Sequence, residues 1–85
     1  MKQQSENISS RTETIRGVVV PEDWDNQFQV KTILIACTGE REIRVENLER
    51  FPALLSMSQQ EAIITGTIHK CGSVESIVVE HVTGL

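Results

Sequence analysis

The sequence predicts a single all-β domain in which five strands close into a barrel, with one short helix. Three observations support this prediction. The apolar residues make up 39% of the chain and concentrate in Val and Ile, whose branched side chains fit a pleated, half-buried surface. Short apolar segments alternate with turn-forming residues. The 85 residues can bury one core but cannot also enclose a deep active site.

The element boundaries follow from the positions of polar, turn-forming and helix-forming residues. We expect residues 1–11 to form a flexible tail, since they are too polar to offset their own ordering entropy, and residues 12–85 to form the barrel domain. Pro21 should end the first strand because proline cannot donate to a ladder. Pro52 should begin the helix, where its missing N–H costs nothing. The predicted elements are strands 12–20, 28–38 and 41–46, the helix 52–57, and strands 61–70 and 74–82.

The first three strands cannot bury their inner face alone, so the last two strands must close over it. Ile43 and Val45 give the third strand a clear apolar face, and the short helix should fill the open end of the barrel.

The face of the second strand that meets the core is ambiguous. Phe28 and Val30 fit one face, whereas Ile33 and Ile35 fit the other. A β-bulge near Thr32 would redirect the outer surface.

Two glycine-centred segments carry a resemblance to a known fold family. They are residues 15–19 (IRGVV) and 64–68 (ITGTI), in which Gly17 and Gly66 are flanked by branched apolar residues. Glycine permits the sharp bend of a strand at a barrel corner. With this order of strands and helix, the chain resembles the oligonucleotide/oligosaccharide-binding (OB) fold family, a five-stranded Greek-key barrel. The resemblance covers residues 12–82 and is closest to small stand-alone bacterial OB-fold proteins of unassigned function.

We expect no catalytic activity, no cofactor and no metal site. Cys37 ends an apolar run and is interpreted as a small hydrophobic residue. His81 is expected opposite Ile64, about five residues or ~16 Å along the ladder from His69. The histidines therefore do not converge with Cys71 on one site, and the segment 69–71 offers two of the four ligands of a structural zinc site.

The sequence predicts a cytoplasmic protein without a membrane segment. The longest apolar run covers residues 33–37, which is far below the ~20 residues that span a bilayer. Residues 1–11 contain no apolar region of the kind found in a signal peptide. Both cysteines are then expected to be reduced.

Nucleic-acid binding is the alternative function. OB domains that bind single strands stack bases on aromatic side chains and follow the backbone with basic groups. This chain has no Tyr, one Trp and two Phe, and its net charge of −4 disfavours phosphate binding. We expect Trp24 to cap the barrel rim and Phe28 to enter the core; in the alternative both are exposed for stacking. The candidate ligand-binding residues are Trp24, Phe28, Arg16, Lys31, Arg41 and Arg44.

Apolar residues on both faces of several strands favour a different function. Residues 18–20, 33–37, 62–64 and 77–79 place Val, Ile or Leu at outward positions. Scattered apolar residues are normal on a surface, but a contiguous patch indicates a protein partner or a homodimer. We therefore predict a non-enzymatic module for protein interaction or self-association. Its surface would be the outer faces of the second and third strands and the loop that holds Trp24.

Overall fold

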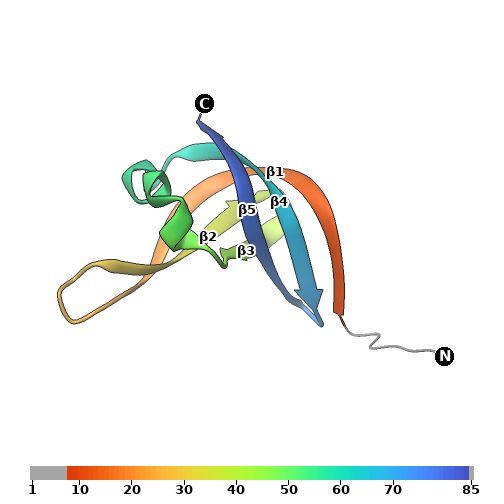
Figure 1. Ribbon diagram of the computed structural model, residues 1–85, viewed down its shortest axis with the longest axis horizontal. Helices are drawn as coiled ribbons and strands as arrows, with labels where there is room; N and C mark the ends of the chain where they lie inside the picture. Colours follow the sequence, from red (N-terminus) through yellow and green to blue (C-terminus); the bar gives the residue numbers. More distant parts are fainter. Residues whose placement is uncertain (1–7, 85) are drawn as a thin grey trace.

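The computed structural model describes the chain from Ile8 to Gly84, and its side chains from Ser10 onward. This span is built mainly of strands, with short 3₁₀ helices between them (Figure 1). The prediction of an all-β chain with little helix is therefore confirmed. The elements are β1 (Ile8–Trp24), β2 (Val30–Cys37), η1 (Thr38–Glu40), β3 (Arg41–Val45), η2 (Leu48–Arg50), η3 (Pro52–Met57), β4 (Glu61–Cys71) and β5 (Val74–Gly84).

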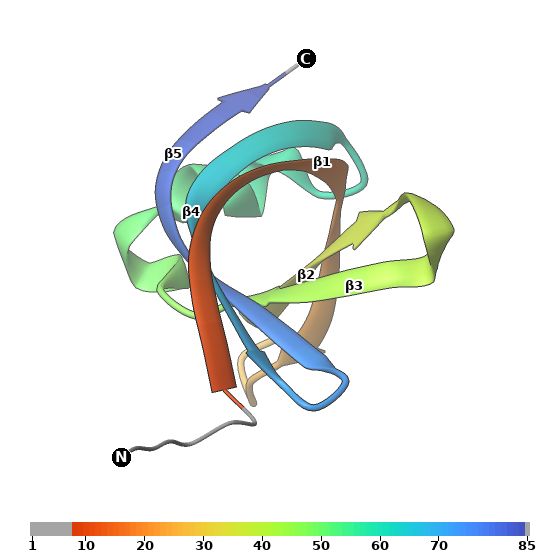
Figure 2. The ribbon, with the colours of Figure 1, turned by 90° about the vertical axis from the view of Figure 1, so that its right-hand side faces the viewer.

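The strands form one sheet that closes in the order β1-β2-β3-β5-β4. The long strand β1 joins two parts of this sheet, because its N-terminal part pairs with β4 and its C-terminal part with β2, both antiparallel. The parallel pairing of β3 with β5 completes the closure. Figure 2 shows β1 and β4 following the same strong curve, with the β2–β3 hairpin to one side.

Gly17 and Gly66 lie where neighbouring backbones approach too closely for any side chain. A Cβ atom at Gly17 would lie 2.6 Å from the carbonyl oxygen of Ala36, and one at Gly66 would clash with the carbonyl oxygen of Val78. The pairing of β4 with β5 also shifts register between Thr65 and Gly66. Both glycines are therefore required by close backbone contact in curved strands.

The core consists of apolar side chains from all five strands and from η3. Leu54 of η3 is completely buried, and Phe51 and Met57 pack against the same cluster. The bounds of η3 match the predicted helix, and its 3₁₀ geometry is usual for so short a segment. No polar or charged side chain is buried in the part of the chain that the structure describes. The buried residues are Ile15, Val19, Ile33, Ile35, Ile43, Val45, Leu54, Ala62, Ile64, Ile68, Ile77 and Val79.

The first strand is longer at both ends than predicted. It begins at Ile8 because its polar residues find backbone partners in β4, where Ser10 pairs with His69. The predicted tail thus loses its last four residues to β1, and residues 1–7 lie outside the described part of the chain. The prediction that Pro21 ends the strand is wrong. Pro21 pairs with Ile33 of β2, but its backbone nitrogen points to the opposite edge, where β4 no longer runs, so no ladder bond is lost.

The bulge suspected near Thr32 is present and resolves the ambiguity of the second strand. The pairing of β1 with β2 shifts register between Pro21 and Asp23 and again between Asp23 and Trp24. As a result Val30 packs against the same core that buries Ile33 and Ile35.

No helix between Ile8 and Gly84 is long and apolar enough to cross a membrane.

Candidate functional site

The β1–β2 hairpin projects from the rest of the molecule, and its turn is organised by Asp25 (Figure 1). The Asp25 carboxylate accepts hydrogen bonds from the backbone N–H groups of Gln29 (2.9 Å) and Gln27 (2.8 Å). These bonds, that from Gln29 first, lower the pKa of Asp25. The backbone N–H of Phe28 donates to the Asp25 carbonyl (3.0 Å), which holds Phe28 in a left-handed conformation with φ of 63°. This turn fixes the direction of the hairpin.

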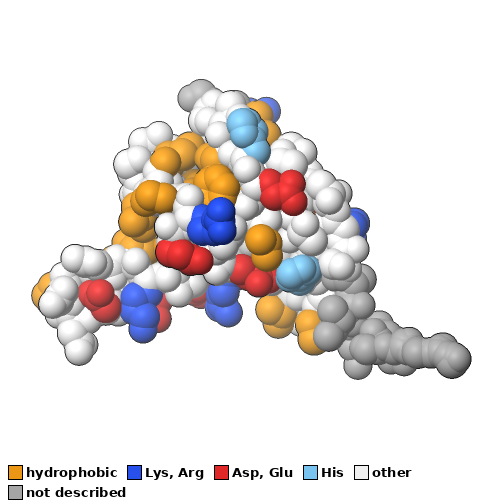
Figure 3. Space-filling view, in the orientation of Figure 1, with side chains coloured by type: hydrophobic (Ala, Val, Ile, Leu, Met, Phe, Trp, Pro, Cys, Tyr) orange, Lys and Arg blue, Asp and Glu red, His pale blue; other side chains and the backbone are white. Residues whose placement is uncertain are grey.

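Trp24 and Phe28 are both exposed at this hairpin, at 50% and 87% of their surface. The expectations that Trp24 caps the rim and that Phe28 enters the core are therefore wrong. Phe28 belongs to the turn, since β2 begins only at Val30, and Val30 takes the core position instead. Figure 3 shows the hairpin at lower left, where most of the visible surface is polar or charged and a small apolar area lies at the far edge of the tip.

The outer faces of β1 and β2 carry a continuous row of half-buried apolar side chains, here called the outer strip. Pairing places Val20 beside Leu34 and Val18 beside Ala36. On the far side of β2, Leu34 is paired with Arg44 and Ala36 with Glu42. The outer strip, consisting of Val18, Val20, Leu34 and Ala36, is therefore apolar in the middle and charged at its β3 border.

A hollow of about 260 Å³ lies beside Leu34 and reaches the tip of the β4–β5 hairpin. A second hollow of about 440 Å³ adjoins it and lies beside Asp23 and Thr32 at the base of the β1–β2 hairpin. They share Glu22 and Arg44, so we treat them as one acidic trough. Its lining contains five carboxylates but a single guanidinium. Among the described residues Arg44 forms one ion pair, an exposed 3.5 Å contact between its Nη2 and Glu22 Oε1. The charged lining residues are Glu22, Asp23, Glu40, Glu42, Arg44 and Glu75.

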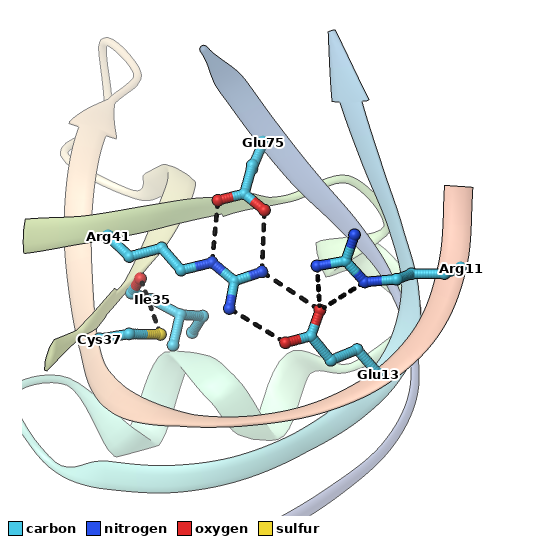
Figure 4. A network of polar contacts seen from close by, with 6 residues as sticks. All are labelled: Arg11, Glu13, Ile35, Cys37, Arg41 and Glu75. Carbon is cyan, nitrogen blue, oxygen red and sulfur yellow. Dashed lines mark hydrogen bonds and ion pairs between the residues drawn. The ribbon is translucent and has the colours of Figure 1, made fainter. Parts of the chain in front are cut away.

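Arg41 is fully engaged by two carboxylates and is not available to a ligand (Figure 4). Its Nε and Nη2 donate to Glu75 at 2.9 and 2.8 Å, and its Nη1 and Nη2 donate to Glu13 at 3.0 and 3.2 Å. These hydrogen bonds raise the pKa of Arg41 and lower the pKa of both carboxyls. Arg11 adds a further bond to Glu13. This group, here called the mouth network, ties β1, β3 and β5 together at one end of the sheet.

The other candidate cations are scattered over the surface. Arg16 is exposed and forms an ion pair with Glu61 at 3.4 Å. Lys31 is exposed on β2, next to the bulge. The structure thus brings Arg44 together with the outer strip, and it places Arg41 in the mouth network.

Cys37 and the two histidines form no nucleophile–base pair in the described residues. Cys37 packs against the core, and burial raises the pKa of its thiol, which keeps it protonated. His81 pairs with Thr65 rather than with Ile64 as predicted, because of the register shift beside Gly66. Cys71 is exposed at the end of β4.

A second polar cluster, which sequence analysis missed, joins Glu46, His69 and Ser76. The Glu46 carboxylate lies 2.8 Å from His69 Nδ1 and also accepts a hydrogen bond from the Ser76 hydroxyl. The bond from Ser76 lowers the pKa of Glu46. Since the hydroxyl donates to a carboxylate and not to the imidazole, the arrangement differs from that of an activated serine. Across residues 8–84 no group of three potential metal ligands comes together.

Comparison of the chain with protein-family models, with curated proteins and with solved structures finds no match.

Proposed function

We propose that the chain is an OB-type Greek-key barrel and acts as a non-enzymatic binding module for a positively charged segment of a partner protein. The fold part of this proposal is supported by the closed strand order, by η3 between β3 and β4, and by the two glycines at close backbone contacts. OB domains use the outer surface of their second and third strands and the neighbouring loops for binding.

The observation that carries the functional part is the combination of apolar and acidic surface on β2 and β3. The outer strip offers Leu34 and Ala36 for burial by a partner, and Trp24 and Phe28 are exposed on the neighbouring hairpin. Aromatic side chains of this kind dominate the energetics of many protein interfaces.

The charge of the acidic trough supports a cationic partner. Of the five carboxylates, Glu75 is bonded to Arg41 and Glu22 contacts Arg44. Asp23, Glu40 and Glu42 have no ion pair among the described residues, and their negative potential attracts Lys and Arg side chains and repels phosphate. An Arg or Lys of the partner can pair with Glu42 or Glu22 while its stem covers the outer strip. Cations also bind favourably over the face of an exposed indole such as Trp24.

A titration with a short Lys- and Arg-rich peptide tests the proposal, with an Asp- and Glu-rich peptide of equal length as the control. Trp24 is the only tryptophan, so its fluorescence reports on the hairpin, and calorimetry measures affinity. We expect binding of the basic peptide only, weakened about tenfold or more by Glu42→Lys, which replaces an attraction with a repulsion. Glu49→Lys makes the same change of charge on η2 and should alter affinity little. Absence of binding, or equal effects of both variants, would contradict the proposal.

The exposure of Trp24 and Phe28 favours one further candidate, weak binding of single-stranded nucleic acid. Exposed aromatics stack on bases whatever their sequence, but the trough between them and β3 repels the backbone. We expect oligonucleotides at low salt to leave Trp24 fluorescence unchanged. Quenching that disappears as salt is added would favour this candidate over the protein-binding module.

A further inference from the structure

One edge of β1 has no strand partner over its N-terminal half. β1 pairs with β4 from Ile8 to Val18 without a register shift, whereas it pairs with β2 only from Val18 to Trp24. Among residues 8–84 no other strand pairs with β1. The edge opposite β4 is therefore open before Val18.

The backbone groups on this open edge follow from the alternation of a strand. The N–H of Val19 donates to the carbonyl of Gln60 and its carbonyl accepts from Gln59, so Val19 points toward the β4 side. Successive residues of a strand direct their N–H and C=O groups to opposite edges, and the regular β1–β4 register preserves this alternation. The residues that point to the open edge are Ser10, Thr12, Thr14 and Arg16.

The open edge is accessible to an added strand. A hollow of about 280 Å³ lies between Thr14 and Arg16 of β1 on one side and Cys37 and Thr38 at the end of β2 on the other. Glu13 and Arg41 of the mouth network also line it. Thr12 and Thr14 are exposed. Proline and bulges, which natural proteins use to block pairing at an edge, are absent from this stretch of β1. Room and unpaired hydrogen-bonding groups thus occur together.

We propose that a second copy of this chain occupies the edge, so that two β1 strands pair antiparallel about a two-fold axis. Such pairing is self-complementary, because each copy contributes the same edge. In a register centred on Thr12, the backbone N–H and C=O groups of the two Thr12 residues lie opposite each other. Arg11 of each copy then lies opposite Glu13 of the other. It also places Ser10 opposite Thr14. Opposite charges and hydroxyl pairs are favourable cross-strand neighbours, and Arg11 already bonds Glu13 within one copy.

The dimer leaves the proposed binding surface open. The acidic trough is lined by residues of the two projecting hairpins and of β2 and β3, and includes none of residues 10–16. A dimer through β1 therefore carries two outer strips, and two linked sites strengthen binding to a partner with two basic segments. The dimer does not depend on that function, because it uses a different surface.

Light scattering combined with size-exclusion chromatography tests the dimer over a wide range of concentration. We expect the mass to rise from one chain to two. Thr12→Pro removes the N–H at the two-fold axis from both copies and should weaken dimerisation at least about tenfold. Thr12→Val keeps the N–H and should dimerise like the parent chain. Glu42→Lys changes only the trough and should also leave the dimer intact, which separates this proposal from the binding function.

Amide hydrogen exchange on the unmodified chain gives a second measurement that does not depend on how any variant folds. The amides of Thr12 and Thr14 should be unprotected in dilute solution and protected at high concentration, whereas that of Ile15, bonded to β4, should be protected in both. A chain that stays monomeric, a folded Thr12→Pro variant that dimerises normally, or Thr12 and Thr14 amides that stay unprotected in the dimer would overturn the proposal.

Discussion

Arg41 and Arg44 lie on the same short strand but have opposite surroundings. Arg41 is half-buried in the mouth network, where its guanidinium donates two hydrogen bonds to Glu13 and two to Glu75. Arg44 is exposed on the outer face and has a single long contact to Glu22. One region is thus saturated with internal partners and stabilises the fold, while the other keeps unpaired carboxylates and apolar surface available to a partner. Both regions are rich in charge and Glu75 belongs to both, so the pairing of the charges determines the role of each region.

The largest effect on stability is expected at Gly17, where the backbones of β1 and β2 are in close contact. Gly17→Ala places a Cβ against the carbonyl of Ala36 and should lower the free energy of unfolding by about 3 kcal/mol, since backbone cannot move aside as a side chain can. Chemical denaturation measures this change. Gly84→Ala is the control, because its Cβ would meet only the flexible end of Met57 at 3.4 Å. Equal stability of the two variants would show that β1 and β2 can separate without cost.

The mouth network should give the next largest effect. Arg41→Ala leaves Glu13 and Glu75 facing each other without their shared cation, at side-chain exposures of 25% and 12%. We expect a loss of about 2 kcal/mol in the free energy of unfolding, between the values for exposed and for buried ion pairs. A loss near zero in chemical denaturation would mean that the network is incidental.

The same network predicts the pH dependence of stability. The folded-state pKa values of Glu13 and Glu75 lie below their ordinary value of 4.5 because of the hydrogen bonds from Arg41. The contribution of these two carboxylates to the free energy of unfolding is therefore complete above pH 4.5. It is lost as the pH falls through their folded-state pKa values. Denaturation of the parent chain and of Arg41→Ala should show a stability difference that narrows in acid. A difference that widens below pH 4.5 would contradict this assignment.

Arg44→Ala should have the smallest effect on stability. Because Arg44 is exposed and its contact with Glu22 is long, we expect a change of less than about 0.5 kcal/mol in the free energy of unfolding. The variant should bind the basic peptide slightly more tightly, since the trough loses its only cation. A stability loss equal to that of Arg41→Ala would remove the distinction between the two regions.

Much of the fold could be predicted because the signals are local. Alternation in β3, Pro52 at the start of η3 and the paired apolar sets around Thr32 each indicate structure within a few residues. The ends of β1 could not be predicted this way. Ser10 is polar and Pro21 lacks a donor, and both are strand residues only because of partners far along the chain.

The candidate site was predicted less well for the same reason. The six candidate residues include Arg44, Trp24 and Phe28, which do lie on or beside the outer face. Arg41 was indistinguishable from Arg44 in the sequence, because Glu13 and Glu75 reach it from β1 and β5. The burial of Phe28 was predicted from its hydrophobicity, but the turn that Asp25 organises places it in solvent.

Backbone NMR spectra recorded during a titration with a Lys- and Arg-rich peptide test the central claim most directly. If the outer face is the binding surface, the largest shifts will fall on Leu34, Glu42, Arg44 and the indole N–H of Trp24, with little change at η3. An unchanged spectrum, or shifts centred on η3 and the mouth network instead, would contradict the account.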